Sequence, residues 1–308
     1  MKISVILCTY NRAGMLGRVL EQLAAQKMPA NWSWDVLVVD NNSKDHTAEV
    51  VRAFVARAPG HFGYAHVARQ GKSWALNAAV ALVDADVLAF TDDDVDIPTD
   101  WLSELARPFE DAACMGVGGR IVPLFAEGQP GWLRGTLPRE FRGPLVQFDL
   151  GDETLPLTLA PFGANMAFRR EIFARHGAFR TDLGPNGAGP GVGEDTELVL
   201  RLLAAGEPLV YAPRALVRHP VTADRLHRRY VVRWWYQQGR ARTLTEGVAS
   251  DIAQVLGVPR YLLRELGAAA MQATLTMDDQ TRVAALSRLA ESYGQIVAAF
   301  RMGRDARR

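Results

Sequence analysis

Residues 35–57 read DVLVVDNNSKDHTAEVVRAFVAR, which places an apolar run, a polar turn and a helix-like stretch in direct succession. The run 35–40 is β-branched and nearly continuous, which is typical of a strand buried on both faces. Ser43 and Asp45 are candidate caps for a helix over 45–57. Similar strands are predicted at 3–8, 62–68 and 87–91, with helices over about 13–26 and 72–83 between them. This alternation predicts a parallel sheet covered by helices.

The chain after residue 98 follows a different order. A helix is predicted near 99–111, then an apolar run at 115–124, a Gly/Pro/Trp-rich stretch at 128–144, an apolar segment at 155–168, a short helix at 170–176, a glycine-rich loop at 184–193 and a helix at 195–205. Residues 226–246 and 259–301 are helix-like, and the second range carries an apolar stripe of Val283, Leu286, Leu289, Tyr293, Val297 and Phe300. We therefore expect an α/β domain over 1–225, with a nucleotide-binding half (1–110) and an acceptor half (111–225), followed by a helical region over 226–308.

Composition excludes several classes of protein. The net charge of +1 argues against nucleic acid as a partner. The two cysteines, Cys8 and Cys114, form no CxxC pair and predict reduced thiols rather than a disulfide framework. No run reaches the ~18 apolar residues of a membrane span, and the start of the chain reads as a strand rather than a signal peptide. We expect a cytoplasmic protein, with peripheral contact at the inner membrane face as an option.

Three consecutive carboxylates follow the strand predicted at 87–91, in the stretch LAFTDDDV over residues 88–95. Like charges this close repel each other unless a cation lies between them. Asp92 and Asp94 alternate along an extended chain, so both can face one ion, and oxygen ligands suit Mg²⁺ or Mn²⁺. The alternative is a solvated acidic turn that caps the helix near Thr99.

A second acidic stretch, Gly193-Glu194-Asp195-Thr196-Glu197, joins the glycine-rich loop to the helix at 195–205. Carboxylates at a helix N-terminus are favoured by the helix dipole, so capping is one interpretation. The functional interpretation makes Asp195 a general base that accepts the proton of an acceptor hydroxyl. A mobile loop before it would admit the acceptor and then exclude water.

Polar residues follow the first two predicted strands, at the edge of the sheet where ligands bind. Tyr10, in Thr9-Tyr-Asn11-Arg12, could stack on a nucleobase, and Asp40 could accept hydrogen bonds from a base or ribose. The stretch GKSWALNAA, with Lys72 and Asn77, opens a helix whose N–H groups could face a phosphate. It is not a P-loop.

These segments resemble family 2 glycosyltransferases, in the order ISVILCTYNR, DVLVVDNNSKD, GKSWALNAA, FTDDDV, GANMAF and GEDTEL. The resemblance covers about residues 1–220. It implies the GT-A fold, a Rossmann-like, mixed but mainly parallel sheet flanked by helices. It also implies an inverting transfer from a nucleotide-sugar donor, by default a UDP-sugar, to a saccharide, lipid-linked or small-molecule acceptor in polysaccharide or glycoconjugate biosynthesis.

The resemblance also implies roles for single residues. Thr9, Tyr10 and Asp40 would hold the base and ribose, Asp92 the nucleotide, and Asp94 the diphosphate through Mn²⁺ or Mg²⁺. Asp195 would be the catalytic base, and His219, in Val-Arg-His-Pro, would join the metal site. We extend the expected nucleotide contacts to Asn11, Arg12, Lys72, Asn77 and Asp93, and the expected sugar or acceptor contacts to Trp132, Asn165 and Glu194.

The region after residue 213 separates this chain from processive members of the family. Those enzymes carry a QxxRW motif and membrane helices, whereas this chain has Tyr230-Val-Val-Arg233-Trp234 and no membrane span, so transfer of a single sugar is expected. Eight arginines and one acid, Asp224, lie between 214 and 242. The stretch 226–246 could pack its aromatic residues on the core, contact the donor diphosphate, or lie on an anionic membrane surface.

Three other functions remain open from the sequence. A sugar nucleotidyltransferase would need a Gly-rich basic stretch after the first strand, where Cys8-Thr-Tyr-Asn-Arg12 stands instead. A phosphohydrolase could use Asp92 as its nucleophile, although Asp96 occupies the position where Thr or Val is expected. A non-catalytic nucleotide-sugar-binding module is the alternative that is not an enzyme.

Overall fold

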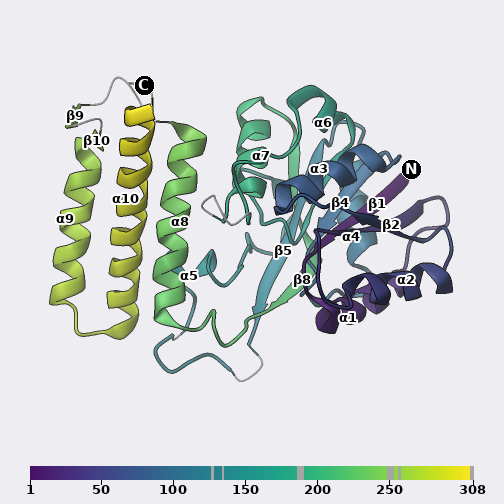
Figure 1. Ribbon diagram of the computed structural model, residues 1–308, viewed down its shortest axis with the longest axis horizontal. Helices are drawn as coiled ribbons and strands as arrows, with labels where there is room; N and C mark the ends of the chain where they lie inside the picture. Colours follow the sequence, from purple (N-terminus) through teal and green to yellow (C-terminus); the bar gives the residue numbers. More distant parts are fainter. Residues whose placement is uncertain (126–127, 134, 186–190, 248–252, 256–257, 306–308) are drawn as a thin grey trace. The chain divides into compact units, whose positions relative to one another are not determined.

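The computed structural model describes residues 1–125, 128–133, 135–185, 191–247, 253–255 and 258–305. The chain forms two compact units, coloured along the sequence in Figure 1. The first comprises Met1–Leu124, Gln147–Gly187 and Glu194–Pro220, and the second comprises Phe125–Val146, Ala188–Gly193 and Val221–Arg308. Residues 125–146 thus belong to the same unit as the C-terminal helices, whereas the predicted boundary at 225 placed them in the first domain. Residues 186–190 of the predicted glycine-rich loop lie outside the described residues.

The first unit is built on one mixed sheet that is mainly parallel, as predicted. Six of its strands run in one direction, and β6 and β7 run antiparallel to their neighbours. The carboxyl ends of the six therefore share one edge, which positions the functional site. The order is β3 (Phe62–His66), β2 (Ser33–Asp40), β1 (Lys2–Thr9), β4 (Val87–Thr91), β7 (Met166–Arg169), β5 (Gly116–Leu124), β8 (Leu209–Pro220) and β6 (Leu155–Pro156).

Helices flank this sheet (Figure 1). They are α1 (Ala13–Ala24), α2 (Thr47–Arg57), α3 (Lys72–Leu82), α4 (Trp101–Ala106) with the 3₁₀ turn η1 (Arg107–Glu110), α6 (Glu171–His176) and α7 (Glu194–Ala204). Helix α1 buries Leu16, Val19, Leu20 and Leu23, the face that its spacing predicts. At the start of α2, Asp45 Oδ1 accepts the N–H of Thr47 at 3.0 Å, whereas the predicted cap Ser43 instead accepts the N–H of Asn11.

A buried amide closes an irregularity at the centre of the sheet. The pairing of β5 with β8 shifts register after Gly119. Asn165 fills this place: its Nδ2 donates to the carbonyls of Arg120 (2.9 Å) and Ala215 (2.7 Å), and its Oδ1 accepts from Trp101 Nε1 at 2.8 Å. Only glycine fits at 119, because a Cβ there would overlap the Asn165 amide. Asn165 therefore ties β5, β8 and α4 together.

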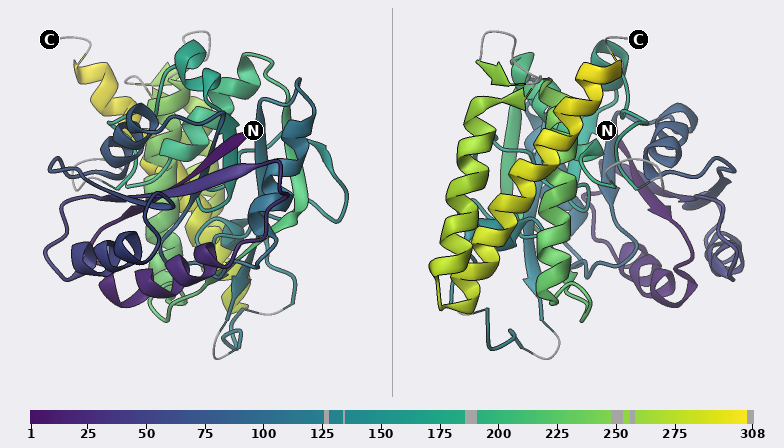
Figure 2. Two further views of the ribbon diagram at one scale, coloured as in Figure 1. Left: turned by 90° about the vertical axis from the view of Figure 1, so that its right-hand side faces the viewer. Right: turned by 60° about the vertical axis from the view of Figure 1, so that its left-hand side comes forward.

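The second unit is helical, with a core of its own. Figure 2 shows α9, α10 and α8 running side by side, and α10 contacts both of the other helices. The elements are α5 (Arg139–Arg142), α8 (Arg228–Glu246), β9 (Gln254–Val255), β10 (Val258–Pro259), α9 (Arg260–Leu275) and α10 (Asp279–Asp305). The core gathers buried side chains from 133–145 and from α8 and α10, among them Leu133, Phe141, Leu145, Val231, Trp235 and Val283.

The C-terminal helices depart from prediction in two ways. The helix expected over 259–301 is interrupted at 276–278, between α9 and α10. The expected apolar stripe is wrong in part, because Tyr293 and Phe300 are about half exposed (51% and 54%). The buried face of α10 instead carries small residues: Ala284, Ala285, Ser287, Ala290, Ser292, Ala298 and Ala299. Small side chains let two helix backbones approach closely.

Two glycines mark this close approach. A Cβ at Gly239 of α8 would overlap the carbonyl of Glu291, and a Cβ at Gly294 of α10 would overlap the carbonyl of Tyr236. We expect Gly239→Ala to lower the free energy of unfolding by about 2–3 kcal/mol in urea denaturation, because the added methyl meets backbone that cannot move aside. Gly267→Ala in α9 is the matched control: no atom lies within 4 Å of its Cβ, so a gain of up to ~1 kcal/mol is expected. Equal effects of the two would contradict the close packing.

Candidate active site

The three carboxylates that follow β4 point in two directions. Asp93 is buried and accepts a hydrogen bond from the hydroxyl of Thr9, at the end of β1, at 2.6 Å. Burial, helped by the charges of Asp94 and Asp92, raises the pKa of the Asp93 carboxyl to about 6, although this hydrogen bond opposes the shift. Asp92 and Asp94 face the other way, as their alternation predicts. Asp93 and Thr9 thus join β4 to β1 below the site.

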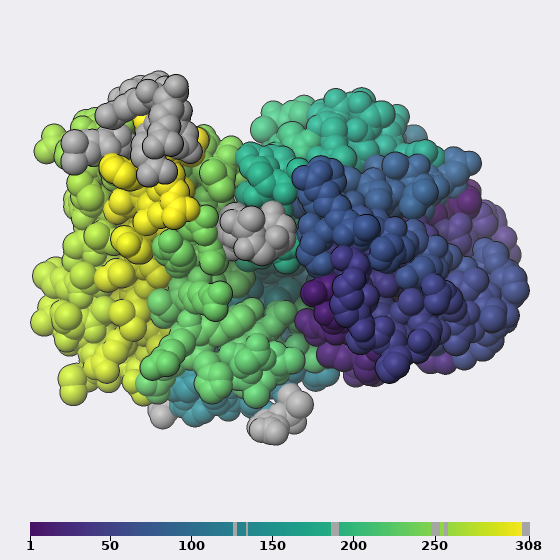
Figure 3. Space-filling view, in the orientation of Figure 1, coloured from purple at the N-terminus to yellow at the C-terminus, as the bar shows by residue number. Residues whose placement is uncertain are grey.

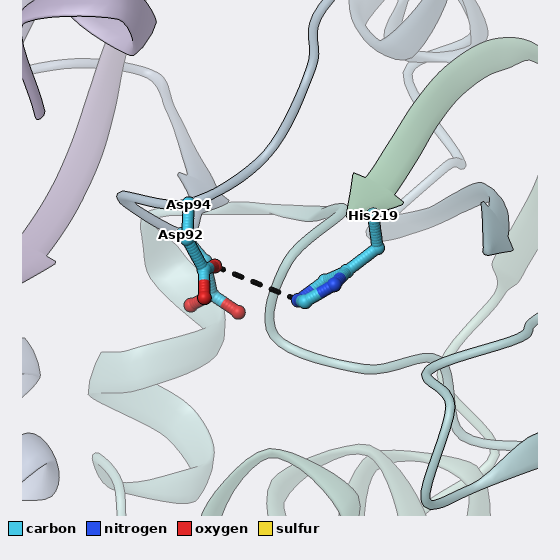
Figure 4. Close-up of side chains that lie close together, drawn as sticks. All are labelled: Asp92, Asp94 and His219. Atoms are coloured by element: carbon cyan, nitrogen blue, oxygen red, sulfur yellow. Dashed lines mark ion pairs between the residues drawn. The ribbon is translucent and has the colours of Figure 1, made fainter. Parts of the chain in front are cut away.

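Asp92, Asp94 and His219 converge on one point (Figure 4). One ligand atom from each lies within 4.8 Å of the others, and His219 Nε2 is 3.5 Å from Asp94 Oδ1. His219 reaches this place because Asp96 and Arg218 exchange backbone hydrogen bonds of 2.8 and 2.9 Å, an isolated bridge between the loop after β4 and strand β8. The loop and the strand end are therefore held in register.

The donor set fits a divalent metal ion. His219 is buried, and its Nδ1 lies 3.1 Å from the carbonyl oxygen of Pro220. A carbonyl can only accept, so this contact assigns the proton to Nδ1 and directs the Nε2 lone pair toward Asp94. Such a hydrogen bond on the far nitrogen is usual for histidines that ligate metals. Two carboxylates and one imidazole nitrogen, all acceptors, are a suitable set for Mn²⁺ and a less usual one for Mg²⁺.

Lys72, the first residue of α3, lies between two groups of carboxylates. Its Nζ is 2.9 Å from Asp92 Oδ1 and 3.7 Å from Glu194 Oε1. Burial alone would lower a lysine pKa, but the charges of Asp92, Glu194 and Asp195 raise the pKa of Lys72 well above its usual value. Lys72 is therefore a fixed positive charge beside the metal-binding cluster.

Glu194 and Asp195, at the start of α7, differ in environment. Glu194 is buried, and burial followed by the charge of Asp195 raises its pKa to about 7, although Lys72 opposes the shift. Asp195 is more exposed, and its Oδ2 accepts the N–H of Gly163 at 2.6 Å while its Oδ1 accepts the N–H of Thr196 at 2.7 Å. Asp195 is thus the carboxylate that a substrate can reach, held in one orientation by backbone.

The pKa of Glu194 predicts a pH dependence of stability. Because it lies above the ordinary value of 4.5, the folded state binds this proton more tightly than the unfolded state. The stabilisation is complete below about pH 4.5 and is lost as pH rises through about 7. In EDTA, the free energy of unfolding of the wild type, measured by urea titration, should decrease by an amount of order 2–3 kcal/mol between pH 4.5 and 8. Glu194→Gln should not show this decrease.

Glu171→Gln is the control for this prediction, since Glu171 makes the same change of charge on an exposed side chain. Its profile should follow that of the wild type. A Glu194→Gln profile parallel to the wild type would show that Glu194 titrates as an ordinary carboxylate.

The ends of β1 and β2 form a joined pair of loops next to this cluster. Asn11, in the left-handed conformation (φ 52°), accepts the N–H of Lys44 at 2.7 Å through its Oδ1. Arg12 extends a guanidinium nitrogen to 3.5 Å from Asp94 Oδ2. Tyr10 is 46% exposed, so its ring is accessible to a ligand. Asp40 is buried and accepts hydrogen bonds from the N–H of Ser43 and the hydroxyl of Tyr64.

The structure gives three other expected site residues different surroundings. Asn165 commits its amide to the bulge between β5 and β8 and is fully buried. Asn77 exchanges hydrogen bonds with the backbone N–H and carbonyl of Phe179 at 2.9 and 2.8 Å, which ties α3 to that segment. Trp132 belongs to the second unit, where its ring packs at 5.6 Å from Phe141. In the structure, these three side chains therefore make contacts within the protein.

Sequence reasoning missed Asn41, the residue after β2. Its N–H donates to the carbonyl of Thr9 at 2.9 Å, its Oδ1 accepts the N–H of Gly71 at 2.7 Å and its Nδ2 donates to the carbonyl of Arg69 at 2.8 Å. Gly71 has φ 131°, a conformation that glycine adopts readily. Asn41 therefore fixes the loop that delivers Lys72. The Asp-Asn-Asn sequence at a strand end was the available signal.

Similar sequences identify the family. The glycosyl transferase family 2 profile matches residues 4–177, more than half of the chain. Succinoglycan biosynthesis protein ExoM of Rhizobium meliloti (strain 1021) is 26% identical over 241 residues, which cover 78% of this chain and 74% of that protein. Glucosyl-dolichyl phosphate glucuronosyltransferase of Haloferax volcanii is 25% identical over 259 residues, covering 80% and 78%.

Solved structures share the fold. A mannosyltransferase of Pyrobaculum calidifontis, in complex with GDP-Man and Mn²⁺, superposes with a TM-score of 0.59 at 20% identity, covering 99% of this chain and 75% of that one. Staphylococcus aureus TarS 1–349 in complex with UDP-GlcNAc gives a TM-score of 0.55 at 15% identity, covering 98% and 92%.

The fold is that of the GT-A glycosyltransferases. By its sequence, the chain belongs to glycosyl transferase family 2. This membership favours the glycosyltransferase over the nucleotidyltransferase, the phosphohydrolase and the non-catalytic module. Within the described ranges, no helix combines the length and the apolar character needed to cross a bilayer.

Proposed function

We propose that this protein transfers one sugar, with inversion, from a UDP-sugar to an acceptor hydroxyl in glycoconjugate biosynthesis. Asp195 is the general base, and Asp92, Asp94 and His219 would hold Mn²⁺ or Mg²⁺. The observation that carries the proposal is the convergence of these three ligands, with Lys72 between them and the start of α7.

The nucleotide is assigned to the ends of β1 and β2. Tyr10 offers an exposed ring for stacking on the base, and Asp40 and Thr9 line the strand ends beneath it. UDP is chosen on the family resemblance. The nucleotide differs between the two solved neighbours, GDP-Man in one and UDP-GlcNAc in the other, so the base must be measured.

The diphosphate is assigned to the acidic cluster and its cations. When bound there, a divalent ion would offset the charge that develops on the leaving diphosphate. The Mn²⁺ in the mannosyltransferase neighbour supports this assignment. Lys72 and Arg12 add two positive charges, 2.9 Å from Asp92 and 3.5 Å from Asp94 respectively. We assign both side chains to contacts with phosphate oxygens as well.

Asp195 is the base because of its access and its neighbours. Backbone N–H groups of Gly163 and Thr196 fix the carboxylate, and Gly163 leaves room beside it: a Cβ at 163 would lie 3.3 Å from Asp195 Oδ2 and 3.5 Å from Lys72 Nζ. The acceptor hydroxyl gives its proton to Asp195 as its oxygen attacks the anomeric carbon from the face opposite the diphosphate, which inverts the configuration.

Calorimetric titration of UDP, GDP, CDP, ADP and dTDP, each with Mn²⁺ and with EDTA, tests the proposal. We expect UDP to bind in Mn²⁺ and to lose most of its affinity in EDTA. Preferential binding of another nucleotide would replace UDP as the donor and keep the metal site. Equal binding with and without metal would remove the metal from the proposal.

A further inference from the structure

The second unit contains a cavity of its own. It measures about 730 Å³ and opens beside the first turn of α8. The indole of Trp132 forms one wall, and Leu226 and Tyr230 contribute further apolar and aromatic surface. The guanidinium of Arg228 lies 5.9 Å from the centre of the Trp132 ring. All of these residues belong to one compact unit, so the cavity is complete within it.

The lining of the cavity is strongly basic. Arg228, Arg229, Arg233 and His227 line it, against a single carboxylate among the lining residues, that of Asp224. Arg228 forms an ion pair of 2.8 Å with Asp279. In the part of the chain that the structure describes, no carboxylate forms an ion pair with Arg229 or Arg233, one helical turn apart on the exposed side of α8. Their positive charge is therefore directed at the cavity and the solvent.

The position of these arginines opposes the helix dipole. Helix α8 has no acidic residue in its first turn and no side-chain cap. Cations at a helix N-terminus are disfavoured by the same dipole that stabilises anions there. An anion in the cavity would relieve the repulsion between the arginines and lie at the positive end of the helix dipole. The fold thus gathers charge that an anionic ligand would offset.

We propose that this cavity binds the phosphate or diphosphate group of a ligand through Arg229 and Arg233, with the rest of the ligand lying against Trp132 and Tyr230. Guanidinium groups suit this task because their planar donor fork matches phosphate oxygens in a bidentate way. The aromatic walls suit a sugar ring or a hydrocarbon next to the phosphate. This proposal does not depend on the function proposed above.

Inorganic pyrophosphate in EDTA is the first probe, because chelation removes metal-dependent binding at the acidic cluster. We expect calorimetry to detect binding that weakens at least tenfold in Arg229→Ala/Arg233→Ala and recovers in part in Arg229→Lys/Arg233→Lys. The double variant Arg260→Ala/Arg264→Ala, on the exposed side of α9, removes the same charge and should bind as the wild type does. Thermal melts confirm that each variant is folded.

A second experiment decides whether the phosphate belongs to a lipid headgroup or to a soluble ligand. Sedimentation with phosphatidylcholine vesicles, with and without phosphatidylglycerol, measures binding to lipid headgroups. Arginine-dependent binding to the anionic vesicles would assign the site to a membrane phosphate, and pyrophosphate binding without vesicle binding would assign it to a soluble one. Absence of binding in both arms, or equal binding by both double variants, would overturn the proposal.

Metal-dependent UDP binding, measured on the same proteins, separates this inference from the proposed function. It should be equal in the wild type and in Arg229→Ala/Arg233→Ala. Loss of pyrophosphate binding with intact UDP binding identifies the second site. A protein that binds pyrophosphate through these arginines but no nucleotide would keep the cavity and refute the donor assignment.

Discussion

Replacement of Asp195 by asparagine is expected to lower kcat for sugar transfer by ~10²–10⁴-fold, the range that a general base contributes. Asparagine keeps one oxygen that can accept the N–H of Gly163, but its NH₂ group cannot accept the N–H of Thr196, so one of the two hydrogen bonds at the start of α7 is lost. The asparagine side chain cannot accept the proton of the acceptor hydroxyl. The affinity for UDP in Mn²⁺ should therefore stay within about twofold of the wild type, as measured by calorimetry beside steady-state kinetics.

The control for Asp195→Asn is Asp84→Asn, which makes the same chemical change on a side chain that is 99% exposed. Both kinetics and UDP binding should be those of the wild type. If Asp195→Asn lost UDP binding as fully as it lost transfer, Asp195 would belong to the nucleotide site and not to proton transfer. Unchanged kcat would exclude it from both.

Asp94→Ala is expected to have the largest effect on metal binding. Its carboxylate lies at the centre of the acidic cluster, 3.5 Å from both His219 Nε2 and an Arg12 guanidinium nitrogen. Loss of an outer partner of a metal ligand already costs 10–100-fold in affinity, so loss of a ligand should weaken Mn²⁺ by at least ~100-fold. Paramagnetic resonance of free Mn²⁺, with and without UDP, measures this directly, and metal-dependent UDP binding should disappear with it.

Asp152→Ala provides the matched change for Asp94→Ala, because its side chain is 90% exposed and pairs with Arg120 away from the cluster. It should bind Mn²⁺ like the wild type. Retained Mn²⁺ affinity in Asp94→Ala, with transfer lost, would assign Asp94 to another part of the reaction.

The nucleotide half of the fold could be predicted because its signals are local. Strand cores such as 36–39 are apolar without interruption, and helices such as α1 repeat apolar residues at three and four positions. The alternation of Asp92 and Asp94 along one strand end similarly predicted that they face together, which the structure shows. Parallel strands then brought these ends to one edge without further information.

The remainder depends on contacts between distant residues. Nothing near His219 in the sequence reveals the bridge from Arg218 to Asp96 that delivers it, and its role was implied by the family resemblance alone. Asn165 lies in a motif that suggests substrate contact. Its amide instead occupies the space beside Gly119 and donates to the carbonyl of Ala215. In α10, burial follows small residues because α8 approaches closely, so the apolar stripe is right at Val283 and wrong at Tyr293 and Phe300.

The bridge between Asp96 and Arg218 also has a thermodynamic consequence. Two of the three proposed metal ligands lie in one loop, and the third comes from a strand more than a hundred positions further along the chain. An unfolded chain cannot hold these three groups together, so a divalent ion would select the folded first unit. At a metal concentration 100 times its Kd, this linkage would add about 2.7 kcal/mol to the free energy of unfolding. The catalytic ion would then also stabilise the fold. Its removal by a chelator would make the first unit more sensitive to heat and to proteases.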